Sequence, residues 1–378
     1  MKINKDVKLD FDDILLVPHR TKTASRKSVN IEREFQFYHS KRRWNGTPIV
    51  AANMDTTGTF AMGVALARHH MVTCIHKYYS LEEHIEKFTS WRKGTGETIH
   101  PIERVWYSLG IKHSEFEALC RFVESTDIVP NICIDVANGY TEDFVEFCAK
   151  VRDNFNDIPI IMAGNVCTPE MVQELILHGG VDIVKIGIGP GSACTTRLKT
   201  GVGYPQFSAI IECSHAAHGL KSEERRMGLI CADGGCRTAA DVCKAFAANA
   251  DFVMLGGMLA GADECEGEWQ YEGWISSSCG MRIQKANSSK PNQKKSLKFY
   301  GMSSKKAQDK HGEGLKDYRS SEGRVFEVPY KGPVDSIIQD LLGGIRSCCA
   351  YIGATSLKDM AKCAEFIQVN RTHFDQST

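Results

Sequence analysis

One pattern repeats along most of this sequence: a short β-branched run ends in Gly, Asn, Asp or Ser and leads into a segment with apolar residues at helical spacing. Parallel strands need helical crossovers, and no dinucleotide-binding fingerprint follows the first run, so the pattern favours a closed barrel over an open doubly wound sheet. We therefore predict an α/β fold, a single (β/α)8 TIM barrel with loop insertions that spans residues 1–378. The expected strands are Pro48–Met54, Met71–His76, Val105–Leu109, Ile132–Ala137, Ile158–Ala163, Val181–Ile186, Gly228–Ala232 and Phe252–Leu255. The expected helices are Thr57–His70, Leu81–Trp91, Ser114–Glu124, Thr141–Phe155, Pro169–His178, Gln206–His218 and Thr238–Asn249.

Charge and cysteine usage narrow the class of protein. Lys plus Arg and Asp plus Glu both number 46, so no overall basic field favours a nucleic-acid partner. The N-terminal residues lack the apolar core of a signal peptide, and no apolar run is long enough to cross a bilayer, so we expect a cytoplasmic protein without a membrane partner. Fifteen scattered cysteines without a paired zinc pattern fit reduced thiols. Redox pairing of Cys231 with Cys236, or of Cys348 with Cys349, is the alternative.

A glycine-rich loop follows the sixth expected strand. Residues 187–197 read GIGPGSACTTR and place Cys194 at the end of that strand. Glycines let the backbone turn sharply and approach a ligand, and a thiol in such a loop can act as a nucleophile. An inert thiol is the alternative interpretation, because most single cysteines are not catalytic.

The other strand ends are also rich in polar residues and glycines. The ends of the seventh and eighth expected strands read Ala232-Asp233-Gly234-Gly235 and Leu255-Gly256-Gly257-Met258. Barrels of this kind commonly hold a phosphate there with backbone N–H groups, and Asp233 offers an acceptor for ribose hydroxyls. The ends therefore indicate a nucleotide monophosphate site, although the glycines also fit simple tight turns. Further polar ends are Asn53-Met54-Asp55, His76-Lys77, Asp135–Gly139 and Ala163-Gly164-Asn165.

Six motifs in one order carry a resemblance to a known family. They are GIGPGSACTTR (187–197), TGVGYPQ (200–206), ADGGC (232–236), FVMLGGM (252–258), FYGMSS (299–304) and YRSSEG (318–323). With these motifs the chain resembles the IMP dehydrogenase/GMP reductase family, and within it the reductases, from Leu9 to Ser347. The resemblance implies a barrel that binds GMP and NADPH and forms IMP, NADP⁺ and ammonia.

The resemblance also implies a mechanism. The Cys194 thiolate would add to purine C2, the 2-amino group would leave, and hydride from NADPH would convert the thioimidate to IMP. Thr196 and Glu322 would move the proton that ammonia needs. Without the resemblance, Glu322 would be interpreted as a solvated loop acid.

The binding residues expected from the resemblance fall into two sets. The substrate set is Asp233, Gly234, Gly235, Gly256, Gly257, Gly301, Met302, Ser303, Arg319, Ser320, Ser321, Glu322 and Gly323. The cofactor set is Ser25, Arg26, Lys77, Asp135, Val136, Ala137, Ile188, Gly189, Met302, Tyr318, Arg319, Ser347, Cys348, Cys349 and Ala350. Simple solvation of Lys77, and a capping role for residues 347–350 on a packing helix, remain alternatives.

A potassium ion and an oligomer are two further expectations from the family. Potassium would bind at backbone carbonyls of the cysteine loop, that is at Gly189, Gly191 and Cys194, with Arg197 nearby. The family pattern also implies a homotetramer.

Two segments depart from the family pattern. Residues 219–227 are longer than the family norm, and a larger insertion covers 267–296, within a surface segment expected to be mobile over 262–297. Its three aromatic residues, Trp269, Tyr271 and Trp274, could instead pack on a neighbour or cover the site.

Two other functions compete with reduction. An IMP dehydrogenase would oxidise IMP to XMP with NAD⁺, but it typically carries a paired regulatory domain after the second strand and an Arg-Tyr pair on its flap. Here a short segment joins His76 to Val105, and the flap reads Tyr318-Arg319. A non-catalytic nucleotide-binding scaffold is the second alternative, which the presence of Cys194, Thr196 and Glu322 disfavours.

Overall fold

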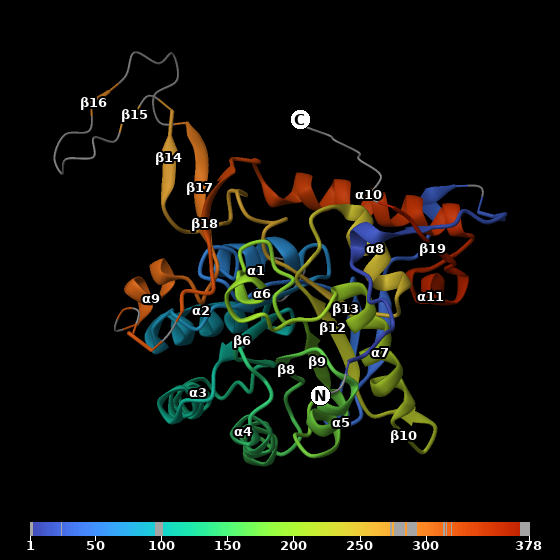
Figure 1. Ribbon diagram of the computed structural model, residues 1–378. Helices are drawn as coiled ribbons and strands as arrows, with labels where there is room; N and C mark the ends of the chain where they lie inside the picture. Colours follow the sequence, from blue (N-terminus) through green and yellow to red (C-terminus); the bar gives the residue numbers. More distant parts are fainter. Residues whose placement is uncertain are drawn as a thin grey trace.

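Eight parallel strands close into a barrel in this computed structural model (Figure 1), in the order β12-β13-β4-β5-β6-β7-β8-β9. The structure describes residues 3–23, 25–94, 101–272, 274–275, 284–285, 293–312, 314, 316–318 and 320–370. The barrel strands are β4 (Ile49–Ala51), β5 (Val72–Ile75), β6 (Val105–Leu109), β7 (Ile132–Asp135), β8 (Ile161–Val166), β9 (Ile183–Ile186), β12 (Leu229–Asp233) and β13 (Phe252–Leu255). Each lies within or overlaps one expected strand, so the prediction of a (β/α)8 TIM barrel is confirmed.

Helices alternate with the strands and surround the barrel (Figure 1). The helices are α1 (Phe60–Ala67), α2 (Leu81–Lys93), α3 (His113–Thr126), α4 (Glu142–Asn154), α5 (Pro169–Leu177), α6 (Thr196–Thr200), α7 (Gln206–Gly219), α8 (Ala239–Ala247), α9 (Lys305–His311), α10 (Val334–Ile352) and α11 (Met360–Cys363). Seven of them match the expected helices. The eighth outer helix is α10, which packs on α1 and α8. It was anticipated from the sequence only through the alternative that residues 347–350 cap a packing helix, and these residues lie in its last turns.

Side chains fill both faces of the barrel wall. Along β4, Ile49 and Ala51 face the surrounding helices and Val50 faces the interior, because successive residues of a strand point to opposite sides. The hairpin of β2 (Arg33–Gln36) and β3 (Arg43–Gly46) covers the N-terminal end of the interior. The ring centroids of Phe35 and Trp44 lie 4.9 and 5.1 Å from the ring centroid of Phe252. This end is thus closed by apolar packing, and the open end is the one where the strands finish.

Four small β-sheets besides the β2–β3 hairpin lie outside the barrel wall in the described residues. They are β1 (Ile14–Leu16) with β19 (Phe366–Gln368), β10 (Lys221–Ser222) with β11 (Arg225–Arg226), β15 (Trp274–Ile275) with β16 (Gln284–Lys285), and the three-stranded sheet β14 (Trp269–Tyr271), β17 (Lys294–Tyr300) and β18 (Val325–Pro329). The 3₁₀ turns are Phe11–Asp13, Arg26–Ser28, Pro101–Glu103 and Leu357–Asp359. None of the helices in the described part of the chain has both the length and the hydropathy that a bilayer crossing requires.

Both segments that depart from the family pattern contain β structure. Residues 219–227 include the β10–β11 hairpin, and the expected mobile segment 262–297 contains β14 and the first residues of β17. The sheet of β14, β17 and β18 stands out from the barrel in Figure 1. Residues 273, 276–283 and 286–292 lie outside the described part of the chain, so the mobility of 262–297 stays a prediction.

Candidate active site

A cavity of about 260 Å³ opens at the end of the barrel where the strands finish. Loops after β4, β7, β9, β12 and β13 line it, together with the residues that follow β17. The predicted site residues in its wall are Asp135, Val136, Ala137, Ile188, Gly189, Gly191, Cys194, Thr196, Asp233, Gly234, Gly235, Gly256, Gly257, Gly301, Met302 and Ser303. Most of the predicted substrate set therefore surrounds one hollow with Cys194.

The cysteine loop begins at a glycine that the geometry requires. Gly187 has a φ of +152°, and a Cβ there would come within 2.2 Å of the carbonyl oxygen of Asp233. The loop then turns back, with the Cys194 N–H donating to the Gly191 carbonyl at 2.9 Å. A β-bridge joins Cys194 to Gly323, and the Thr195 N–H donates to the Glu322 carbonyl at 2.8 Å. The loop is thus tied to the segment that precedes β18.

This contact brings the three predicted catalytic side chains together. The Cys194 Sγ lies 3.2 Å from the Thr196 Oγ1, and the Thr196 hydroxyl donates to the Glu322 Oε2 at 2.6 Å. Because the single hydroxyl proton of Thr196 points to Glu322, the Cys194 thiol is the donor to Thr196 when it is protonated. A continuous path for a proton therefore runs from the sulfur to a carboxylate 126 residues beyond Thr196 in the chain.

Glycines let other loops approach the cysteine loop closely. Gly234 has a φ of +88°, and a Cβ there would lie 3.1 Å from the Gly191 nitrogen. A Cβ at Gly301 would lie 2.7 Å from the Ala193 carbonyl oxygen. These positions leave backbone groups exposed to the cavity, which is the arrangement that a phosphate or a purine edge requires.

A buried lysine joins the two sides of the cavity. Lys185, on β9, is 1% exposed and forms ion pairs with Asp135 at the end of β7 and with Asp233 at the end of β12, the latter at 3.2 Å. The Asn165 amide also donates to Asp233, at 2.9 Å. Burial opposes the charge on Lys185, but the two carboxylates hold its pKa well above the ordinary value. Burial likewise opposes the charge of Asp135, and Lys185 holds the pKa of that carboxyl below the ordinary value.

Sequence analysis did not identify Lys185 as a site residue. The sequence feature that could have identified it is a lysine inside the apolar run Val184-Lys185-Ile186, because a buried charge there is expected only when an oppositely charged side chain pairs with it. The partners come from two other strands, so only the closed barrel identifies them.

Part of the predicted cofactor set lies elsewhere. Arg26 packs over the ring of Tyr351 with 5.8 Å to its centroid, and the 3₁₀ turn after Ser25 contacts α10. Ser347 and Cys348 line a second, largely apolar cavity of about 500 Å³ between β1, α8 and α10. The structure therefore places Ser25, Arg26 and residues 347–350 together at α10. None of them lines the cavity that contains Cys194.

The remaining predicted residues have different surroundings. Lys77 forms an ion pair with Glu115 at 3.1 Å. Ser320 and Tyr318 are exposed, and the Ser321 hydroxyl accepts from the Lys305 N–H at 3.0 Å. Arg319 lies outside the described residues.

His76 is a buried titratable group near the site. It is 5% exposed, stacks on Tyr79 at 4.0 Å and accepts from the Tyr78 N–H at 3.2 Å. Burial lowers the pKa of His76 from 6.5 to about 4, although the charge of Asp55 opposes this shift. The ring is therefore neutral in the folded protein at pH 7.

The fold and these contacts define a TIM barrel with a cysteine thiol next to a threonine–carboxylate pair at its open end. The model of the IMP dehydrogenase / GMP reductase domain matches residues 8–378. The chain is 49% identical to GMP reductase 1 of Mus musculus over 374 residues, which cover 98% of each chain. It is 49% identical to GMP reductase 2 of Homo sapiens, covering 98% of this chain and 96% of the relative, and 47% identical to the GMP reductase of Vibrio campbellii, covering 98% and 97%. The chain belongs to the IMP dehydrogenase/GMP reductase family and is an enzyme of that family.

Replacing Lys185 with Met should lower the free energy of unfolding by about 3 kcal/mol, because it leaves the carboxylates of Asp135 and Asp233 close together without their shared cation. Urea unfolding at pH 7 measures the change. The control is Lys294→Met, which removes the cation of an ion pair with Asp263 at the surface and should cost much less. Equal stability of Lys185→Met and the wild type would contradict this account.

Acid should destabilise the protein through His76. The unfolded chain takes up the proton near pH 6.5 and the folded protein only near pH 4, so the free energy of unfolding falls as the pH drops through this window. The full loss is about 3 kcal/mol at 1.36 kcal/mol per pKa unit. Urea unfolding at pH 7 and pH 4.5 should show a smaller difference for His76→Phe than for the wild type. Identical pH dependence in both proteins would mean that His76 does not cause the loss.

Proposed function

We propose that this enzyme catalyses the NADPH-dependent reductive deamination of GMP to IMP and ammonia, within purine nucleotide interconversion. The observation that supports this most directly is the hydrogen-bonded path from Cys194 through Thr196 to Glu322 at the edge of a glycine-lined cavity. The sequence relatives named GMP reductase support the same reaction.

The chain's own side chains divide the reaction into two steps. The Cys194 sulfur attacks purine C2, and the 2-amino group leaves as ammonia when it receives a proton through Thr196 from Glu322. This step forms one C–S bond and breaks one C–N bond: Cys194 enters as the thiolate, its own proton having left to solvent, and the leaving amine takes the proton of the Glu322 carboxylic acid. NADPH, when bound, would supply a hydride for C2, and departure of the Cys194 thiolate would then complete IMP.

The nucleotide is held by loops from several strands. Glycines after β12 and β13 present backbone N–H groups to the phosphate, and Asp233 accepts hydrogen bonds from the ribose. Gly301, Met302 and Ser303 face the cavity from the other side and would contact the purine.

The residues present fit a nicotinamide cofactor in two groups. Asp135 through Ala137, Ile188, Gly189 and Met302 line the cavity that contains Cys194 and would hold the nicotinamide end. Ser25, Arg26 and residues 347–350 lie together around α10, away from that cavity. We also propose a homotetramer, in which this second group on a neighbouring copy would contact the cofactor and Arg26 would suit its phosphate.

Potassium fits the cysteine loop only in part. The Gly191 carbonyl already accepts from the Cys194 N–H, and the Arg197 guanidinium lies against the loop. Arg197 donates to the carbonyls of Ile188 and Tyr204 and pairs with Asp10 at 3.0 Å. Since a fixed cation already occupies this side of the loop, no step in the proposed reaction depends on potassium.

The proposed location is the cytoplasm. All cysteines within the described residues are free thiols, which is the state that a reducing compartment maintains.

Cys194→Ala should still bind GMP but should lose turnover and any covalent nucleotide adduct, because the attacking sulfur is absent. Calorimetric titration with GMP measures binding, NADPH absorbance and ammonia release measure turnover, and mass spectrometry of the protein measures the adduct. Cys120→Ala, which removes a half-buried thiol on α3, is the control and should keep wild-type turnover. Turnover by Cys194→Ala at the wild-type rate would exclude covalent catalysis by this residue.

Glu322→Gln should slow the deamination of GMP by about 100-fold or more while GMP still binds, because the amide has nearly the same size but cannot exchange a proton. With IMP and NADP⁺, the same variant should still give a single-turnover burst of NADPH, since hydride transfer releases no ammonia. A variant that binds IMP and NADP⁺ but loses the burst as fully as steady-state turnover would show that Glu322 activates the thiol or organises the hydride step.

A further inference from the structure

We propose that Asp55 is a positioning residue for Glu322 and acts through helix α9; the inference rests on the proposed role of Glu322 in deamination. Asp55 lies in the loop after β4 and is 3% exposed. Asp55 is distant in sequence from α9 and from the segment that contains Glu322. Hydrogen bonds nevertheless connect Asp55 to α9, and α9 to that segment.

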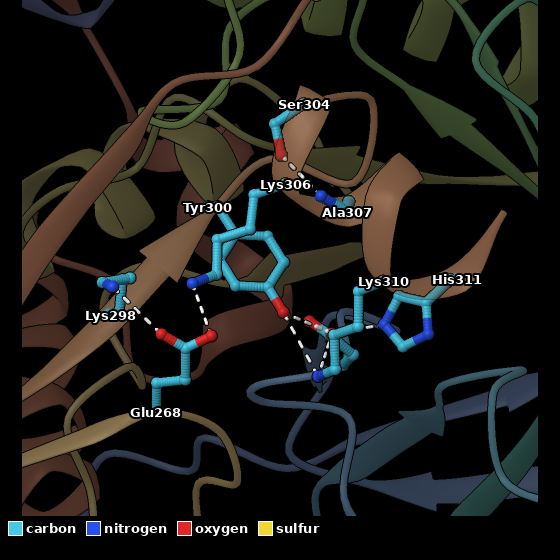
Figure 2. A network of polar contacts seen from close by, with 9 residues as sticks. Glu268, Lys298, Tyr300, Ser304, Lys306, Ala307, Lys310 and His311 are labelled. Carbon is cyan, nitrogen blue, oxygen red and sulfur yellow. Dashed lines mark hydrogen bonds and ion pairs between the residues drawn. The ribbon is translucent and has the colours of Figure 1, made fainter. Parts of the chain in front are cut away.

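One carboxylate oxygen of Asp55 holds the end of α9. The Oδ2 accepts from the Tyr300 hydroxyl at 2.6 Å, from the Lys310 ammonium at 2.9 Å and from the Nε2 of His311 at 2.6 Å when that nitrogen carries its proton. Figure 2 shows the side chains of Tyr300, Lys310 and His311 converging at this point. Burial opposes the charge of Asp55, but these donors hold its pKa below the ordinary value.

A second contact holds the same end of the helix. The His311 ring stacks on Tyr78, which follows β5, with 3.7 Å between the ring centroids and 15° between the planes. The last turn of α9 is therefore attached to the loops after β4 and β5. Glu268 forms ion pairs with Lys306 of α9 and with Lys298 of β17 (Figure 2). Because the Glu268 side chain is 60% exposed, these pairs contribute little to holding α9 in place.

The first turn of α9 holds the segment that contains Glu322. The Glu322 N–H donates to the Ser303 carbonyl at 3.1 Å, and the Lys305 N–H donates to the Ser321 hydroxyl at 3.0 Å. A Cβ at Gly323 would lie 2.8 Å from Ser304, so the two segments are in direct contact. The Ser304 hydroxyl itself accepts from the Ala307 N–H at 3.2 Å and caps the helix.

The length of α9 explains why the distant anchor matters. It has seven residues, and a helix this short has little stability without tertiary contacts. When Asp55 holds its last turn, the first turn and residues 321–323 keep one position, and Glu322 stays 2.6 Å from Thr196. A displacement of about 1 Å at a reacting group can reduce a rate about 100-fold.

Asp55→Asn is the main test, because it keeps the size of the side chain but removes the charge that attracts Lys310 and leaves only a neutral amide oxygen, a weaker acceptor for the three donors. It should lower kcat for GMP reduction by about 10-fold to 100-fold with little change in the KM for GMP. The burst of NADPH from IMP and NADP⁺ should remain near the wild-type amplitude. Glu268→Gln, which removes only the exposed ion pairs of Lys306 on α9 and Lys298 on β17, should keep wild-type kcat.

The double variant separates positioning from a general loss of stability. If Asp55 acts through Glu322, Asp55→Asn should slow Glu322→Gln no further, because the group that it positions is already inactive. Multiplying losses in the double variant, or an Asp55→Asn variant with wild-type kcat, would overturn the inference. His311→Phe keeps a ring over Tyr78 and loses one donor to Asp55, and it replaces Asp55→Asn in both tests if that variant does not fold.

Hydrogen exchange tests the anchor without any substrate. The amides of residues 305–312 should exchange faster in Asp55→Asn than in the wild type and at the wild-type rate in Glu268→Gln. Unchanged exchange in Asp55→Asn would overturn the inference. Failure of the wild type to reduce GMP would instead overturn the proposed function, while the exchange result would still decide whether Asp55 holds α9.

Discussion

The site depends on one contact, the β-bridge between the cysteine loop and the segment that enters β18. The loop ends a barrel strand, whereas Glu322 belongs to an excursion between β17 and β18 that leaves the barrel and returns to it. Two backbone hydrogen bonds, from Thr195 to Glu322 and from Arg324 to Ala193, fix the two segments to each other. Because backbone bonds set this register, the side chains of Thr196 and Glu322 meet with little freedom, as a proton relay requires.

The second constraint is the buried ionic group of Lys185, Asp135 and Asp233, whose removal from water lowers the stability of the fold. Placing Lys185, Asp135 and Asp233 at the end of the barrel removes ionic groups from water, a cost that ion pairs often do not recover in full. Apolar side chains would pack the barrel interior at lower cost, as Trp106 and Phe252 do further along the barrel. The ionic group instead holds two carboxylates in fixed positions at the cavity, which agrees with a site that binds two ligands.

The distribution of predicted binding residues has a physical consequence for the cofactor. One group lies with Cys194, and the other lies around α10 beside an apolar cavity. A single copy thus has the two predicted groups at separate places.

The sequence by itself determined the barrel and the place of the cysteine. Strand and helix periodicities are local properties, so all eight barrel strands could be predicted, and the glycine-rich run from Gly187 marked the loop that presents Cys194. It did not reveal the extent of α10, the strand β14 or the partners of Lys185, and Glu322 could be placed near Cys194 only by resemblance to a family. Tertiary structure decided those points, because each depends on residues far apart in the chain. Lys185 is stable as an ion only where three strand ends converge, Glu322 approaches Thr196 only when β17 and β18 pair, and Asp55 meets His311 only when α9 folds back onto the barrel.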